Sequence, residues 1–116
     1  MGGTVGEPLT TFIGSDRTVQ NLERSITKLD SIYAIIEKGV KSGAISPEQA
    51  FEKLNRLEDI IARTEQRLQE EAIASRDVRL ALRGQRVENV ILASREKLQG
   101  TRKETALRAT QVAFGS

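Results

Sequence analysis

The chain has 116 residues, of which 29% are charged and only 3% aromatic, a composition poorly suited to a globular core. It contains no Cys and no His, which excludes disulfide scaffolds, thiol nucleophiles, Cys/His zinc sites and the commonest general base. Its apolar runs, such as Tyr33–Ile36, are much shorter than the roughly 20 residues that a membrane-spanning helix needs.

The first 14 residues, MGGTVGEPLTTFIG, combine several Gly and one Pro with isolated apolar residues. Gly and Pro disfavour a helix, so we expect an extended N-terminal arm over residues 1–14 that docks on a neighbour. A disordered tail is the alternative. The segment lacks the basic and apolar regions of a secretory signal.

A first helix is predicted over residues 15–42, because apolar residues recur there at alternating intervals of three and four. Ser15 is suited to cap its start, and Gly39 and Gly43 weaken its end. The apolar seam of this helix comprises Val19, Leu22, Ile26, Leu29, Tyr33, Ile36 and Val40.

A turn over residues 43–46 precedes a second helix that starts at Pro47. Ser46 and Gln49 form a capping-box pattern around Pro47, which is favoured at the first position of a helix. Because a short connection makes neighbouring helices antiparallel, the two helices are expected to form a hairpin. The second half of the hairpin seam comprises Leu54, Leu57, Ile61, Thr64 and Leu68.

No proline follows Pro47, and the helical pattern continues over residues 47–114, which predicts one helix about 100 Å long. The first helix is too short to cover more than about a third of it. A second apolar phase covers the remainder, so this part is expected to pack against other copies of the chain. The predicted oligomer interface comprises Ile73, Val78, Leu80, Leu82, Val87, Ile91, Leu98, Val112 and Phe114.

Two glycines interrupt the predicted long helix, which is expected to bend or break near 84 and 100. Thr101 and Glu104 match a second capping box, so a restart after Gly100 is one interpretation. Close packing of a neighbouring backbone on Gly84 is the alternative to a bend there.

No nucleotide-binding, zinc-protease, nucleophile-elbow or EF-hand motif is present in the sequence. The acidic pairs Glu58–Asp59 and Glu70–Glu71 are adjacent, so they do not place two carboxylates on one helical face. We therefore expect no enzyme activity, no catalytic residue, no metal site, no cofactor and no small-molecule substrate.

Charge is distributed unevenly along the chain. Residues 1–75 carry 9 Lys or Arg against 12 Asp or Glu, whereas residues 76–116 carry 9 against 4. This contrast suits stacking of neighbouring subunits, or contact between the basic part and nucleic acid. The candidate residues for contact with nucleic acid or an acidic surface are Arg76, Arg79, Arg83 and Arg86, although a solvated helix face explains them equally well.

The segment 72–116 resembles the N-terminal helical region of the internal virion (DNA ejection) proteins of short-tailed bacteriophages. The residues that carry the similarity are Leu82, Arg83, Gln85, Arg86, Arg95, Arg108, Gln111, Ala113, Gly115 and Ser116. The resemblance implies a protein packed inside the capsid near the portal, in a ring of copies, and released with the genome.

The sequence thus predicts an all-α, coiled-coil-like antiparallel hairpin with a very long second helix. Its expected function is structural: a homo-oligomeric ring or tube in a phage virion, made in the host cytoplasm. Portal or tail proteins are expected partners, with non-specific contact to packaged DNA. The alternatives are a component of a bacterial secretion or flagellar axial structure, and a basic DNA-associated coiled coil.

Overall fold

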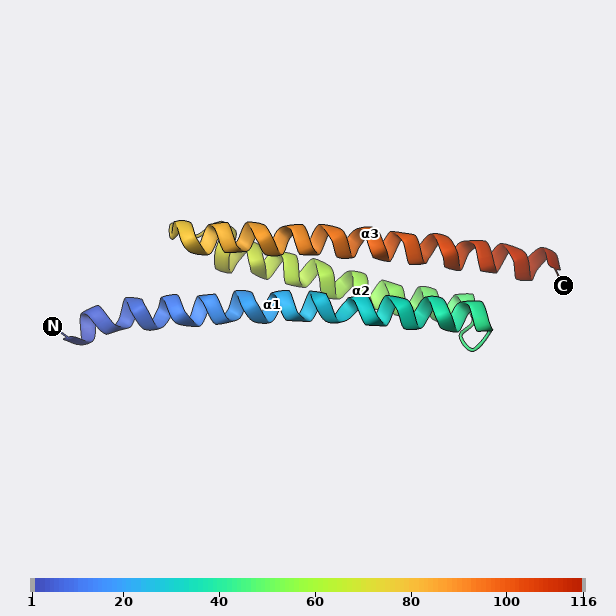
Figure 1. Ribbon diagram of the computed structural model, residues 1–116, viewed down its shortest axis with the longest axis horizontal. Helices are drawn as coiled ribbons and strands as arrows, with labels where there is room; N and C mark the ends of the chain where they lie inside the picture. The colour runs from blue at the N-terminus through green and yellow to red at the C-terminus, as the bar shows by residue number, and fades with distance from the viewer. Residues whose placement is uncertain (1, 116) are drawn as a thin grey trace.

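The computed structural model describes the backbone of residues 2–115 and the side chains of residues 17–111. The fold is all-α, as predicted, with α1 (Gly2–Ser42), α2 (Pro47–Leu68), the one-turn π-helix η1 (Gln69–Ile73) and α3 (Val78–Gly115). The three long helices lie side by side in a rod of 75 × 19 × 16 Å, in which α1 and α3 run in the same direction and α2 runs back alongside both (Figure 1).

The hairpin of α1 and α2 is confirmed, together with the signals that define its turn. Gly43 has a φ of +82°, a conformation that favours glycine. The Ser46 hydroxyl accepts a hydrogen bond from the Gln49 N–H at 3.2 Å, and the Gln49 side chain accepts one from the Ser46 N–H at 3.2 Å. This capping box begins α2 with Pro47 in its first turn.

The backbone of α1 begins at Gly2, so the extended arm expected over residues 1–14 is wrong for the described residues 2–14. From Val19 onward, the apolar seam of α1 packs in the core of the bundle, which stabilises that part of the helix. Gly and Pro disfavour a helix interior, so intrinsic propensity does not explain the helical backbone of residues 2–14. Figure 1 shows that this first part of α1 extends beyond the end of the bundle.

The single long helix expected over residues 47–114 is also wrong, because the chain reverses between Leu68 and Val78. Ser75 Oγ accepts a hydrogen bond from the Asp77 N–H at 3.1 Å. Asp77 Oδ1 in turn accepts from the N–H groups of Arg79 at 3.0 Å and Leu80 at 3.3 Å. Asp77 therefore caps a new helix, α3, which runs back along the hairpin.

The reversal places the second apolar seam inside the bundle. Leu80, Val87, Ile91 and Leu98 are at most 5% exposed and belong to the same core as the hairpin seam. Their assignment to an oligomer interface is therefore corrected, because α1 and α2 of the same chain cover them.

The other residues of the predicted interface have different surroundings. Ile73 is partly buried and packs on the core, whereas Val78 and Leu82 are 70% and 63% exposed. The side chains of Val112 and Phe114 lie outside the described residues.

The hairpin seam occupies the centre of the rod. Its residues are buried, except for Leu22, which is partly buried and packs against them. The buried members are Val19, Ile26, Leu29, Tyr33, Ile36, Val40, Leu54, Leu57, Ile61, Thr64 and Leu68. Ala50 and Ala72 extend the same core along α2 and η1.

The two glycines of α3 have different roles, and neither breaks the helix, which is continuous from Val78 to Gly115. A Cβ placed on Gly84 would lie 2.8 Å from the Cβ of Ala72 and 3.1 Å from Cγ1 of Ile73. A Cβ on Gly100 would meet nothing within 4 Å. Gly84 therefore permits close packing of η1 on α3. Thr101 and Glu104 lie inside the helix, so the second capping box is not used.

We predict that Gly84→Ala and Gly100→Ala change stability in opposite directions. Both substitutions gain about 1 kcal/mol of helix propensity. Gly84→Ala also pushes Ala72 and Ile73 of η1 away from α3, which costs about 1–3 kcal/mol. Thermal unfolding followed by circular dichroism measures both. Gly100→Ala is the matched control, and equal stabilisation by the two substitutions would contradict the close contact at Gly84.

Candidate interaction surfaces

Polar contacts join α3 to α1 along the rod. Lys97 Nζ lies 2.9 Å from Asp30 Oδ2, and Lys41 Nζ lies 4.0 Å from Glu104 Oε1. Further along the same contact, the Thr101 hydroxyl lies 3.0 Å from Glu37 Oε1. Asp30 and Glu37 are seven residues apart, so one flank of α1 supplies the carboxylates that face α3.

A second set of polar contacts joins α3 to α2. Arg95 pairs with Glu65, and Arg102 pairs with Glu58. Arg102 also donates a hydrogen bond to Asn55 Oδ1 at 3.1 Å. Part of the charge contrast between the two halves of the sequence is therefore used in ion pairs within one chain. The sequence had suggested ion pairs between neighbouring subunits.

The buried polar contact between Tyr33 and Ser94 joins the cores of α1 and α3. The two hydroxyl oxygens are 3.1 Å apart, and both residues are almost fully buried. Burial raises the pKa of Tyr33 above its usual value of 10.0, the hydrogen bond to Ser94 opposes this rise, and the nearby charges of Asp30 and Lys97 have smaller, opposite effects.

The interhelical ion pairs identify which flank of α2 faces each neighbour. Glu58 and Glu65 lie on the flank that faces α3, so the opposite flank borders α1. All four cations of α2 lie on that opposite flank, and they are exposed. They are Lys53, Arg56, Arg63 and Arg67.

The neighbouring flank of α1, turned away from Asp30 and Glu37, completes what we call the basic face. It contributes Lys28, together with Ile32 and Ile35, which are 36% and 63% exposed. From α2, Ile60 is 40% exposed. No Asp or Glu lies on this face between residues 17 and 68. The basic face comprises Lys28, Ile32, Ile35, Lys53, Arg56, Ile60, Arg63 and Arg67.

The face between α2 and α3 has the opposite character, and we call it the acidic face. Its two arginines, Arg95 and Arg102, are already paired with carboxylates of α2. Five carboxylates on this face and on the adjoining outer edges of α2 and α3 have no ion-pair partner among the described residues: Glu48, Glu52, Asp59, Glu88 and Glu96. One cation without such a partner, Lys103, shares the outer edge of α3 with Glu96. One oxygen of Glu88 is buried without a hydrogen-bond partner.

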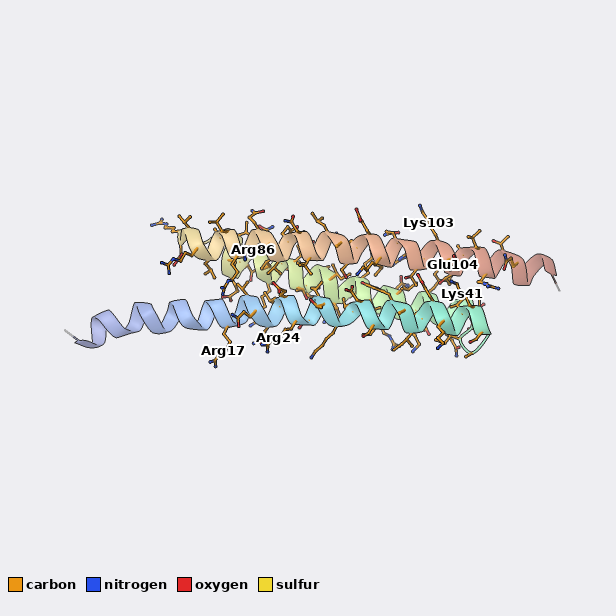
Figure 2. All side chains as sticks on the ribbon, in the orientation of Figure 1. Arg17, Arg24, Lys41, Arg86, Lys103 and Glu104 are labelled. Carbon is orange, nitrogen blue, oxygen red and sulfur yellow. The ribbon has the colours of Figure 1, made fainter. Side chains whose placement is uncertain are left out.

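The predicted arginine stripe lies at the start of α3 and in the turn before it. Arg76, Arg79, Arg83 and Arg86 are all exposed. Other cations point outward elsewhere: in Figure 2, Arg17 and Arg24 point away from the bundle below α1, and Lys103 points away above α3. Cations therefore occur on more than one side of the rod.

The structure brings no metal-binding cluster together within residues 17–111: no group of three or more acidic side chains there is placed to hold an ion. Over the same residues, none of the helices combines the length and the apolar content that crossing a bilayer requires. Comparisons with protein-family models, with curated proteins and with solved structures gave no match.

The two charged faces were not predicted from the sequence. The sequence feature that indicates these faces is the side of the α2 seam on which each charged residue lies. The cations of α2 lie on one side of the seam, and Glu58 and Glu65 lie on the other. The signal becomes interpretable only when the third helix is known to pack on the flank of Glu58 and Glu65.

We predict that Tyr33→Phe destabilises the fold at neutral pH by about 0.5–1.5 kcal/mol, because the hydrogen bond to Ser94 is lost. Tyr33 has a raised pKa in the folded state, so its contribution is present below pH 10 and is lost as the pH rises through its folded pKa. The stability difference between wild type and variant should therefore shrink above pH 10.

This difference is measured by chemical unfolding at several pH values. Because the chain has one Tyr and no Trp, tyrosinate absorbance reports the ionisation of Tyr33 directly. Ser94→Ala is the matched control, since it removes the partner and retains the ionisable group. Ionisation of Tyr33 in the folded protein at the usual pKa would contradict this prediction.

Proposed function

We propose that this chain is a non-catalytic structural subunit of a bacteriophage particle that packs against copies of itself and against neighbouring virion proteins. The virion setting rests on the resemblance of residues 72–116 to internal virion proteins. Synthesis in the host cytoplasm and contact with portal or tail proteins belong to the same proposal. A secretion or flagellar axial component would also suit a helical rod, but no residue pattern favours it.

The observation that carries self-association is an aliphatic stripe on the outer side of α3. Val78, Leu82 and Leu92 are 70%, 63% and 51% exposed and lie on the side of α3 opposite its buried residues. Covering apolar surface is favourable by about 25 cal/mol for each Å² removed from water. Two of these residues, Val78 and Leu82, belong to the oligomer interface predicted from the sequence. Their side chains are exposed and are therefore available for contact between copies.

Contact with packaged DNA is a second proposed activity. Arg76, Arg79 and Arg86 are exposed and have no ion-pair partner among the described residues. Arginine binds phosphate oxygens well, and no described feature suits base recognition, so any such binding would be independent of sequence. Its test is the affinity for duplex DNA as a function of salt, which falls steeply when phosphates are contacted.

We predict that the double variant Leu82→Ser, Leu92→Ser weakens self-association and leaves the fold intact, because both side chains point to solvent within one chain. Sedimentation velocity over a range of protein concentrations measures association, and circular dichroism measures the fold. Leu80→Ala is the matched control on the same helix. Leu80 is 5% exposed, so its truncation should destabilise the fold by about 2–5 kcal/mol.

The two results separate packing within the chain from packing between chains. A wild-type protein that stays monomeric at every concentration would contradict the self-association proposal. The virion setting is tested separately, by mass spectrometry of purified particles of the phage whose genome encodes the chain. Absence of the chain from those particles would contradict it.

A further inference from the structure

The two faces that meet along α2 have opposite unpaired charge. On the basic face, Lys28, Lys53, Arg56, Arg63 and Arg67 are exposed, and none has an ion-pair partner among the described residues. On the acidic face and its outer edges, five unpaired carboxylates outnumber one unpaired cation, Lys103; the carboxylates are those of Glu48, Glu52, Asp59, Glu88 and Glu96. Arg95 and Arg102 are neutralised there by Glu65 and Glu58.

The exposed aliphatic residues follow the same two faces. Ile32, Ile35 and Ile60 lie on the basic face, at 36%, 63% and 40% exposure. Val78 and Leu92 border the acidic face on the outer side of α3. Each face therefore combines an excess of one sign of unpaired charge with large apolar side chains, and the two faces complement each other in both respects.

We propose that the basic face is a docking surface for the acidic face of a second copy of this chain. Contact between the two faces would pair the unpaired cations with carboxylates and cover the three isoleucines with the aliphatic stripe of α3. The inference rests on the proposed self-association and specifies which surfaces meet.

The distribution of charge also selects the symmetry. A two-fold dimer brings the same surface of both copies together. Contact between two basic faces, or between two acidic faces, would place like charges opposite each other. Contact between a basic and an acidic face uses different surfaces on the two copies, so each copy retains one unused face for the next. Such heterologous contacts build rings when they close and filaments when they do not.

A second copy fits the basic face better than a nucleic acid does. Phosphate groups would pair with the cations, but they would leave the three isoleucines without an apolar partner. The face also has no aromatic side chain on which bases could stack. A protein surface with both carboxylates and aliphatic groups would pair with the cations and also cover the isoleucines.

Charge-reversal variants test the pairing of the faces. The basic-face variant is Lys53→Glu, Arg67→Glu, and the acidic-face variant is Glu52→Lys, Glu96→Lys. All four side chains are exposed and have no ion-pair partner among the described residues, so the fold should be retained. Circular dichroism and thermal unfolding of each variant check this.

Each variant alone should associate at least about tenfold more weakly than the wild type, because one of its faces loses two attractive charges and gains two charges that repel the facing surface of the next copy. An equal mixture of the two variants should recover association, since the unaltered acidic face of the basic-face variant fits the unaltered basic face of the acidic-face variant. Sedimentation velocity of each variant and of the mixture measures this recovery. Association of the wild type should also weaken as salt rises from about 0.1 M to about 1 M, where the screening length falls to about 3 Å.

The outcomes distinguish this inference from the broader proposal. A wild type that associates, with variants that associate equally well or a mixture that does not recover, would overturn the face pairing and leave self-association standing. A wild type that is monomeric in low salt would overturn both. A monomeric wild type whose binding to duplex DNA is lost in the basic-face variant would identify the basic face as a phosphate-binding surface and likewise overturn the inference.

Discussion

The reversal of the chain between Leu68 and Val78 determines the rest of the structure. It places α3 along the hairpin, so that the seams of three helices form one core. The reversal depends on the cap that Asp77 provides and on the absence of a side chain at Gly84, where Ala72 and Ile73 approach closely. Without this reversal, α3 would expose the apolar seam that it now buries.

Between the first apolar residue of the α1 seam, Val19, and this reversal, the fold was predictable from the sequence, whereas residues 2–14 are helical and not the extended arm that was expected. The heptad seam of α1, the turn at Gly43 and the capping box at Ser46 are local signals, and each corresponds to an observed contact. The break after Leu68 was missed because apolar residues continue through 72–82 in two overlapping phases. The overlap was interpreted as a helix touched from two sides, whereas it reflects two helices that each contribute to one core. Ser75 and Asp77 were the signal available, but a cap next to a continuous apolar pattern is easily overlooked.

The surfaces were less predictable than the core. The sequence shows an acidic first part and a basic second part, but it does not show which charges are used within the chain. Glu58, Glu65 and Asp30 are paired with α3, and this leaves the cations of α2 unpaired on one flank. The distinction depends on tertiary packing, since the same residues in an isolated hairpin would form a mixed surface. The charged faces are therefore a property of the three-helix arrangement.

The position of Tyr33 makes this residue an intrinsic spectroscopic probe for the packing of the third helix on the hairpin. Tyr33 is the only tyrosine in a chain without Trp, and its hydroxyl contacts Ser94 of α3. Its intrinsic fluorescence therefore responds to the arrival of the third helix, whereas helical dichroism responds to every helix at once. A refolding experiment that records both signals can resolve the order in which the hairpin and the third helix come together.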